Sequence, residues 1–454
     1  MTTVQIPVDR APAQAGGASP KVVARTGLYA LMAANVAVVT YFFGQSGFGT
    51  NALILMGRVT GLYGTLVMAF QFILVARLPW FDRRLGMDRL TTWHRWTGFT
   101  LLWLLLSHAV FITLGHAQLA DLPPVTELVD LATTVEGVLR AVVALFLIIV
   151  IGGVSARYAR RRMAYETWHF IHFYAYVAVV LAFTHQIAAG STFNTSEPAT
   201  AYWWGLWTFA LGSVVVGRFG LPLYRNLRHQ LRVAAVVPEA DNVVSIYITG
   251  RDLHRMPARA GQFFLWRFLT RDRWYKANPF SLSAAPDGRS LRLTAKAAGE
   301  GSASLRYLKV GTRVFAEGPY GAFTAMHRTK PNAVLVAGGV GVTPIRALLE
   351  ELHGHAVVLY RVRDPRDAVL LNELRHLALV RGAVLHLLTG PSAAPTPRGP
   401  LLAPHSLAAM VPDIRDRDVF VCGPPAMTDA VMTSLRELKV PKQQVHAERF
   451  SMAG

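Results

Sequence analysis

Two pairs of histidines lie in apolar stretches of the first half of the chain. His94 and His108 belong to TTWHRWTGFTLLWLLLSHAVF, and His172 and His185 belong to WHFIHFYAYVAVVLAFTHQ. Neutral imidazole is a common axial ligand of haem iron, and two imidazoles on opposite sides of the iron fill both axial positions, which suits electron transfer. A histidine inside a membrane also forms interhelical hydrogen bonds, and this is the competing interpretation for each of them taken singly.

The spacing of the two histidines within each stretch determines how their rings are arranged around that helix. His94 and His108 are 14 residues apart, nearly four helical turns, so their imidazoles lie within about 40° of one helix face and roughly 21 Å apart along the axis. His172 and His185 are 13 residues apart, and an ideal helix turns them about 140° away from each other. His169 in place of His172 gives a similar misfit, so rotation alone does not choose between them. Zinc or copper would need three or four ligands converging on one point, whereas these histidines are paired at two depths.

Six apolar segments of the first half are each long enough to cross a bilayer. The chain has 454 residues, 52% of them hydrophobic, and a mean hydropathy of +0.32, which is typical of a membrane protein. The third and fifth segments run in the same direction, which places His94 and His172 at the inner level and His108 and His185 at the outer level. The sequence therefore predicts an all-α bundle with spans at 27–43, 52–76, 91–114, 138–154, 168–189 and 201–217.

Positively charged residues alternate between the loops of this bundle. Arginines follow the second, fourth and sixth spans, whereas the loops 44–57, 116–137 and 186–202 contain no Lys or Arg. This alternation predicts a multi-pass protein of the cell membrane with both termini in the cytoplasm. It also explains part of the formal net charge of +19, so the lipid bilayer is the expected partner and nucleic acid is not.

A further cation, Arg58, lies in the apolar sequence LILMGRVTGLYG, at about the depth of His108. A buried cation needs an anionic partner or a wet cavity. A haem propionate would serve, which makes Arg58 a candidate catalytic residue. The alternative is that Arg58 extends to the outer headgroups.

From about residue 230 the sequence changes to short β-rich runs, and from residue 333 strand and helix signals alternate. In KAAGEGSASLRYL, three residues precede a predicted helix start, where backbone N–H groups favour a phosphate. A simple capping turn is the alternative. These residues are Gly299, Gly301 and Ser302.

The stretch AVLVAGGVGVTPIRALLEEL predicts a buried strand, a glycine turn and an amphipathic helix, the arrangement that lets a pyrophosphate approach the backbone. After the next strand, Arg361 and Arg363 follow where the ribose of a dinucleotide would lie. Arginine there suits a 2′-phosphate, with solvated surface charge as the competing interpretation. The residues predicted to bind the pyrophosphate are Gly338, Gly339, Gly341, Thr343 and Pro344.

The single cysteine, Cys422, excludes an intrachain disulfide. With Gly423 and Pro424 it ends another predicted strand, in DVFVCGPPAMTDAVMTSL. Ligands of open parallel sheets bind at that edge, so these three residues are candidates for nucleotide binding.

The second half resembles the ferredoxin-NADP reductase type of flavoprotein module, on NPFSLSAAP, KAAGEGSAS and the glycine turn. The resemblance implies that NPFSLS lines the flavin, that KAAGEGSAS binds its phosphates, and that Glu448 to Phe450 cover the isoalloxazine. In this sequence the flavin-lining residues are Pro279, Phe280, Ser281, Leu282 and Ser283, and the phosphate-binding residues are Lys296, Gly301 and Ser302.

Six spans with paired histidines ahead of such a module resemble the ferric reductase and NADPH oxidase superfamily, in particular its compact bacterial members. The resemblance covers about residues 25–454, and the spacings of 14 and 13 recur in that superfamily, which favours His172 over His169. It implies a haem-binding membrane domain at 25–220, an FAD-binding β-barrel domain at 228–328 and an α/β domain that binds NAD(P)H at 329–454. The residues before these domains are rich in Ala, Pro, Gly and Thr, and this composition predicts a disordered tail at 1–24.

Three positions depart from the family pattern. Asn278 stands where relatives usually have Arg or His, so one phosphate contact is missing. Ile112, four residues after His108, replaces the further histidine that superoxide-forming oxidases tend to carry, which weakens the inference of superoxide production. Phe450 is followed by Ser451–Gly454 instead of ending the chain, which weakens its inferred stacking role.

Together these features predict a membrane flavocytochrome b that moves electrons from cytosolic NADPH, or NADH, through FAD and two b-type haems to an outer acceptor. The acceptor is a ferric chelate or dioxygen. Two alternatives stay open: a haem-containing subunit that feeds a periplasmic or extracellular partner reductase, and a haem transport or sensor protein without enzymatic activity. The candidate catalytic residues are Phe450, Cys422, Ser281 and Arg58.

Overall fold

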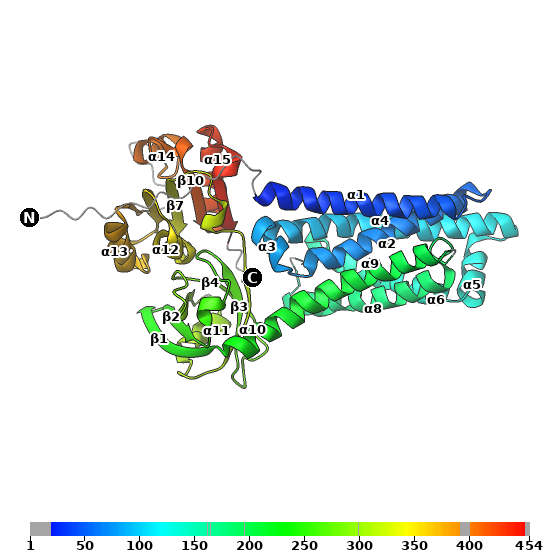
Figure 1. Cartoon of the computed structure of the whole chain (residues 1–454), viewed down its shortest axis with the longest axis horizontal. Helices are drawn as coiled ribbons and strands as arrows, with labels where there is room; N and C mark the ends of the chain where they lie inside the picture. The colour runs from blue at the N-terminus through cyan, green and yellow to red at the C-terminus, as the bar shows by residue number, and fades with distance from the viewer. Residues whose placement is uncertain are drawn as a thin grey trace, which may run out of the picture.

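The chain folds into a bundle of long helices followed by a half built on β-sheets (Figure 1). The computed structural model describes residues 20–160, 162–163, 165–194, 196–297, 299–390 and 400–449. The tail expected at 1–24 lies mostly outside these residues, and helix α1 begins at Pro20. Figure 1 shows that the start of α1 lies at the same end of the bundle as the sheet-based half.

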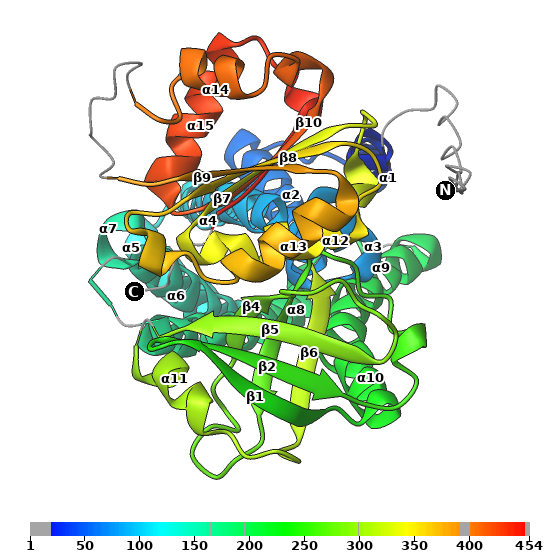
Figure 2. The same ribbon diagram turned by 90° about the vertical axis from the view of Figure 1, so that its left-hand side faces the viewer.

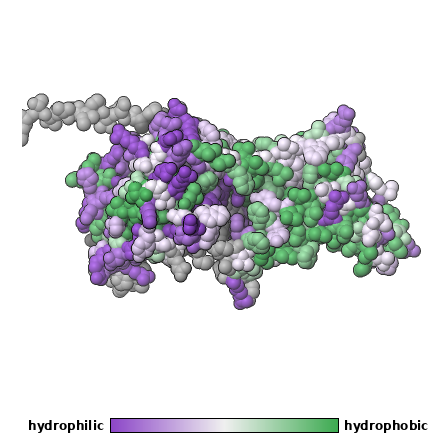
Figure 3. Space-filling model, turned by 90° about the horizontal axis from the view of Figure 1, so that it is seen from below, coloured by the Kyte–Doolittle hydropathy of each residue, from purple (hydrophilic) through white to green (hydrophobic). Residues whose placement is uncertain are grey.

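Six helices of the described chain are long and apolar enough to cross a membrane, which confirms the six predicted spans. The last of them continues through a short π-helical turn, Val216–Gly220, into α10 (Leu221–His229), which leads to the second half. Figure 3 shows hydrophobic side chains covering the bundle and hydrophilic ones gathering over the other half. The spans are α1 (Pro20–Gln45), α2 (Ala52–Val75), α4 (Met87–Ala120), α6 (Val138–Ser155), α8 (Tyr165–Ala189) and α9 (Glu197–Val215).

Three short helices lie between the spans. The sequence patterns did not predict α3 (Pro79–Leu85), α5 (Pro124–Thr134) or α7 (Arg157–Arg160). Helices α3 and α5 each begin with proline, which is suited to the first helical turn because its missing N–H would be unpaired there.

Helix α2 packs closely against α4, and α8 packs against α6, whereas the backbones of α4 and α8 do not approach each other closely. Glycines make the close approach of α2 possible. A Cβ atom at Gly57 would stand 2.7 Å from the Ile112 side chain, and one at Gly64 would stand 3.1 Å from that of Leu105. Small residues at such spacing allow the backbones of membrane helices to meet.

The β-rich domain contains two three-stranded antiparallel sheets, with strand orders β1-β2-β5 and β4-β3-β6. Isolated bridges join the sheets at Leu282–Leu293 and Arg232–Arg313. The domain is therefore sheet-based, with two linked sheets in place of one continuous ladder. Its strands are β1 (Arg232–Ala240), β2 (Val243–Thr249), β3 (Phe263–Phe268), β4 (Asn278–Ser281), β5 (Ser290–Lys296) and β6 (Val314–Tyr320).

The last domain has a parallel sheet of strand order β11-β10-β7-β8-β9. Helices α12 (Val342–Glu351) and α13 (Leu371–Arg381) cover one face, and α14 (Pro404–Met410) and α15 (Pro425–Glu437) cover the other (Figure 2). Strand residues buried on both faces explain the continuous apolar runs of the sequence. The strands are β7 (Ala333–Gly338), β8 (Ala356–Arg361), β9 (Val384–Leu388), β10 (Asp418–Gly423) and β11 (Val445–Arg449).

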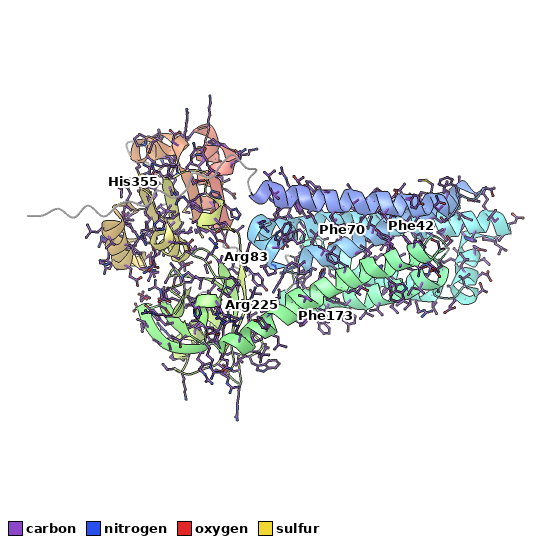
Figure 4. The ribbon with its side chains drawn as sticks, viewed as in Figure 1. Phe42, Phe70, Arg83, Phe173, Arg225 and His355 are labelled. Atoms are coloured by element: carbon purple, nitrogen blue, oxygen red, sulfur yellow. The ribbon has the colours of Figure 1, made fainter. Side chains whose placement is uncertain are left out.

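Strand β6 and the segment after it hold the β-rich domain against the membrane half. Glu317 forms an ion pair with Arg77 at 2.8 Å, and the backbone N–H of Gly321 donates to Asp82 at 2.9 Å. The backbone N–H of Ala316 donates to Asn226 at 2.8 Å. Figure 4 labels Arg83 and Arg225 at this junction. These contacts place the β-rich domain at one end of the bundle (Figure 1).

Candidate redox sites

The structure brings the four membrane histidines together as two pairs. The rings of His94 on α4 and His172 on α8 have their centroids 6.1 Å apart, at an interplanar angle of 72°. The rings of His108 and His185, further along the same helices, are 6.4 Å apart at 58°. His169 belongs to neither pair, and its exposed ring lies 6.2 Å from that of Trp168.

The separation of the rings fits a metal ion held between two imidazoles. Bonds of about 2 Å from a metal to a nitrogen on each side, with about 1 Å from each nitrogen to its ring centre, separate the centroids by about 6 Å. The residues that the structure describes contain no group of three His, Cys, Asp or Glu that could hold a metal ion. The donor set thus suits two sites with two imidazoles each. Because α4 and α8 stand apart, a planar macrocycle is compatible with their spacing.

The surroundings of His108 fix its tautomer. Its Nδ1 lies 2.8 Å from the carbonyl oxygen of Gly57, and a carbonyl only accepts, so Nδ1 carries the proton and Nε2 keeps a lone pair for a metal. A Cβ atom at Gly61 would clash with the imidazole at Nδ1. Two glycines of α2 therefore provide both the hydrogen-bond acceptor and the space that His108 requires.

His172, predicted to be the inner ligand, is held by an indole ring and a hydroxyl group. The Trp168 ring stacks on the His172 ring with centroids 5.0 Å apart and planes 26° apart. The indole N–H of Trp168 donates to the hydroxyl of Ser155 at 3.1 Å, and this oxygen lies 3.5 Å from Nδ1 of His172. We did not single out Trp168 or Ser155 in the sequence. The available signal was the four-residue spacing of Trp168 and His172, which places both on one helix face.

Arg58 turns its guanidinium toward the end of α1. Its Nη1 donates to the carbonyl of Gly47 and its Nη2 to the hydroxyl of Ser46, both at 2.7 Å. The guanidinium also lies 5.1 Å from the ring centre of Phe43. Its Nε is buried without a hydrogen-bond partner among the described residues. All of these partners are neutral, so the positive charge remains available to an anion.

Strand β4 presents only part of the predicted flavin surface. Ser281 is 3% exposed and its hydroxyl has no hydrogen-bond partner within the described chain, which fits a polar group of a cofactor. Pro279 is exposed and Phe280 half-buried. Leu282 and Ser283 differ from the prediction, because the structure places both in the protein interior with no exposed surface.

The hydroxyl of Ser283 is already used inside the protein. It accepts hydrogen bonds from Nε of Arg292 at 3.0 Å and from the hydroxyl of Thr294 at 2.8 Å. Arg292 in turn pairs with Glu373 of α13 at 2.9 Å. Ser283 therefore helps to hold Arg292, which links the β-rich domain to the last domain, a role that its position in NPFSLS did not suggest.

The predicted phosphate turn lies after β5 and includes α11 (Glu300–Ala303). The hydroxyl of Ser302 bonds locally to Gly299, donating to its carbonyl at 3.1 Å and accepting from its N–H at 3.3 Å. Lys296 is exposed at the end of β5. A cavity of about 430 Å³ is lined by Ser302 together with the β1–β2 turn. The local bonds match a capping turn, and the adjoining cavity leaves room for a phosphate ligand.

The glycines of the predicted nucleotide site meet at the carboxyl ends of β7 and β10. A Cβ atom at Gly338 would stand 2.5 Å from the sulfur of Met427, and one at Gly341 would clash with the carbonyl of Cys422. Gly339 adopts a φ of +52°, which a side chain disfavours. Thr343 donates to the carbonyl of Val340 at 3.0 Å. Pro344 is buried in the first turn of α12.

Cys422 itself is fully buried at the end of β10, and Gly423 and Pro424 lead from it into α15. Burial raises the pKa of the Cys422 thiol well above its ordinary value, so the side chain is a neutral thiol. Glu448 of β11 is its register partner. Phe450, predicted to cover the flavin, lies outside the described residues.

The two arginines predicted near the ribose differ in their surroundings. The guanidinium of Arg361 donates to three backbone carbonyls, those of Val362, Leu388 and Gly390. Arg363 is exposed, and its own carbonyl accepts from the N–H of Gly390 at 3.0 Å. The positive charge of Arg363 is thus accessible, whereas the guanidinium of Arg361 is hydrogen-bonded to carbonyls at and after the end of β9.

Each half of the chain matches a known protein family. Residues 60–183 match the family model described as "Ferric reductase like transmembrane component", and residues 335–433 match "Oxidoreductase NAD-binding domain". Ferredoxin--NADP reductase B of Sorangium cellulosum (strain So ce56) is 30% identical over 190 residues, which are 38% of this chain and 77% of that protein. The second half of the chain therefore belongs to the ferredoxin--NADP reductase family, and the first half contains a segment that matches the ferric reductase-like transmembrane component.

Other relatives also match the second half of the chain. The ferredoxin reductase component of 3-ketosteroid-9-alpha-monooxygenase of Mycobacterium tuberculosis (strain CDC 1551 / Oshkosh) is 32% identical over 240 residues. The match covers 49% of this chain and 65% of that protein, just under two thirds of its length. The flavohaem-like FAD/NAD-binding domain of nitric oxide dioxygenase from Vibrio cholerae O1 biovar El Tor aligns over 49% of this chain and 99% of its own, at 24% identity and a TM-score of 0.40. The module of this protein is of the NAD(P)H oxidoreductase class.

Proposed function

We propose that the protein transfers electrons across the cell membrane, from cytosolic NAD(P)H through FAD and two b-type haems to an acceptor on the outer face. The observation that carries this proposal is the pair of imidazoles at each of two levels on α4 and α8. The arginine-rich loops favour a cytoplasmic position for both termini and for the reductase module.

The position of the module supports the same direction of transfer. Strand β6 holds the β-rich domain against the end of the bundle where His94 and His172 lie. Two of the matching relatives are a ferredoxin--NADP reductase and the ferredoxin reductase component of a monooxygenase. In this chain the membrane half takes the place of a separate electron acceptor, and we propose the β-barrel flavin domain at 228–328 and the NAD(P)H domain at 329–454.

The residues of the chain bind and orient the reacting groups. When bound, flavin accepts a hydride and releases single electrons, and haem iron carries one electron at a time. The glycine turn after β7 receives the pyrophosphate of the dinucleotide, and the hydroxyl of Ser281 hydrogen-bonds to the flavin. The hydrogen bond from Nδ1 of His108 to Gly57 keeps Nε2 directed at the metal.

The stoichiometry of electrons and protons follows from the electron donor, NAD(P)H. NAD(P)H loses a hydride, so two electrons cross the membrane and reduce two one-electron acceptors, and one proton is released on the cytoplasmic side. We favour ferric iron as the acceptor and place dioxygen second, because Ile112 stands where superoxide-forming relatives carry a histidine. The apolar Ile112 side chain packs against Gly57.

Anaerobic reduction of the detergent-purified protein tests the proposal. After addition of FAD and NADPH, we expect the absorption bands of reduced b-type haem, which a ferric chelate then reoxidises with two chelates reduced for each NADPH. Oxygen admitted to a second sample measures the competing acceptor. Protein that contains haem but is not reduced by NADPH would instead support a haem transport or sensor protein.

Exchange of Arg363 for alanine is expected to raise the KM for NADPH about tenfold and to leave that for NADH unchanged, because an exposed guanidinium there binds the 2′-phosphate. The matched control is Arg361→Ala, which is expected to reduce stability by about 1–3 kcal/mol by leaving carbonyls unpaired. Steady-state kinetics with both coenzymes and thermal unfolding measure the two effects. A parallel rise of both KM values in Arg363→Ala would contradict the assignment.

A further inference from the structure

Arg273 is a buried cation whose hydrogen-bond partner is neutral. It lies in the segment between β3 and β4, and the residue is 4% exposed. Its Nη2 donates to the carbonyl oxygen of Gly301, whereas Nη1 is buried without a hydrogen-bond partner among the described residues. Burial lowers the pKa of Arg273. A buried charge without an anionic partner is costly, and buried donors are normally paired.

The neighbouring carboxylate of Asp272 opposes the effect of burial on the pKa of Arg273, but the net shift is downward. Asp272 is exposed, and its carboxylate accepts a hydrogen bond from the hydroxyl of Thr270 at 2.8 Å. The guanidinium of Arg273 donates to the carbonyl of Gly301 in the turn after β5. Lys296 and Ser302 belong to the same turn region, so Arg273 adds a second positive charge from a different part of the chain.

Asn278 does not supply a charge at the position where related proteins carry one. Its side-chain nitrogen donates to the carbonyls of Lys276 at 3.2 Å and Trp266 at 3.4 Å. The amide is thus bound to its own sheet and the preceding loop. A buried cation stands five residues earlier, at Arg273, and it donates a hydrogen bond to Gly301 of the predicted phosphate turn.

We propose that Arg273 binds the phosphates of the flavin cofactor and provides the positive charge that Asn278 lacks. The inference rests on the proposed function, since it requires that the β-rich domain binds flavin. The planar guanidinium presents several N–H donors that match phosphate oxygens, and Nη1 has the unused donors. Pairing with a phosphate would compensate the desolvation of Arg273.

Three flavins test this assignment: riboflavin has no phosphate, FMN adds one phosphate, and FAD adds a second phosphate together with adenosine. The full-length protein in detergent, freed of flavin, is titrated with FAD, FMN and riboflavin, and binding is followed by flavin fluorescence. Arg273→Gln is expected to weaken FAD and FMN binding about 10- to 100-fold, as for loss of hydrogen bonds to a charged group, and to leave riboflavin binding unchanged. The matched control is Arg271→Gln, which removes the same charge from an exposed position of the same loop and is expected to change none of the three.

The outcomes distinguish a failure of the Arg273 assignment from a failure of the proposed electron-transfer function. Equal weakening of all three flavins by Arg273→Gln would show that Arg273 only supports the turn, and unchanged FAD binding would likewise overturn its role. Arg273→Lys keeps the charge and is expected to retain part of the affinity. The haem absorption spectrum of each variant reports that the membrane half is folded. If the wild-type protein binds no flavin of any kind, the proposed function fails, and this inference fails with it.

Discussion

Exchange of His172 for alanine is expected to abolish electron transfer from NADPH to the outer acceptor, with a loss of more than about 100-fold. Loss of groups that merely support a metal ligand costs about 10- to 100-fold, and His172 is proposed to be a ligand itself. Reduction of the flavin by NADPH is expected to continue, because the substitution leaves the soluble half unchanged. Stopped-flow absorption at the flavin and haem bands measures the two steps separately.

The matched control is His169→Ala, three residues earlier in α8. Its ring belongs to neither imidazole pair, so haem content and electron transfer are expected to stay near those of the wild type. Normal inner haem in His172→Ala together with its loss in His169→Ala would reverse the assignment. Normal haem in both variants would contradict the proposal that α8 supplies the inner ligand.

Exchange of Gly61 for alanine is expected to remove about half of the bound haem by emptying the outer site. The added methyl group would clash with the His108 ring and push Nδ1 away from the Gly57 carbonyl. Without this hydrogen bond the ligand loses its tautomer and orientation. Haem per protein, from pyridine haemochrome absorption, and a redox titration that resolves one or two centres measure the effect.

Gly212→Ala serves as the control, because a Cβ atom at this position of α9 meets nothing within 4 Å. Alanine is a better helix former than glycine, so this variant is expected to keep both haems with unchanged or slightly raised stability. Full haem content with unchanged potentials in Gly61→Ala would show that the tight α2–α4 contact does not position His108.

The architecture followed from the sequence because its causes are local and periodic. Spans of about 20 apolar residues and charged loops define membrane helices regardless of their packing. Runs such as AVLVAGGVGV combine a buried strand with a glycine turn, and both signals lie within ten residues. The levels of the histidines also followed, since two spans that run in the same direction carry their residues in the same order.

The sequence predictions were less complete where side chains meet across elements. The patterns contained no signal for the linkage of the two β-sheets. Arg361 and Arg363 look equivalent in sequence, yet only the course of β9 and the residues after it directs backbone carbonyls at Arg361. Ser283 stands two residues after Ser281, but the Arg292 side chain of a neighbouring strand takes up its hydroxyl.

The sequence by itself determined six spans, a sheet-based reductase module and the two levels of histidines, because hydropathy, charge and glycine turns act within one segment of the chain. Tertiary structure decided which rings meet. An ideal helix turns His172 and His185 about 140° apart, yet their rings lie 6.1 Å from that of His94 and 6.4 Å from that of His108 on α4. The side chains of both helices extend into the space between α4 and α8, whose backbones do not approach each other closely. That spacing depends on how α2 and α6 pack against the two helices, and no single segment encodes it.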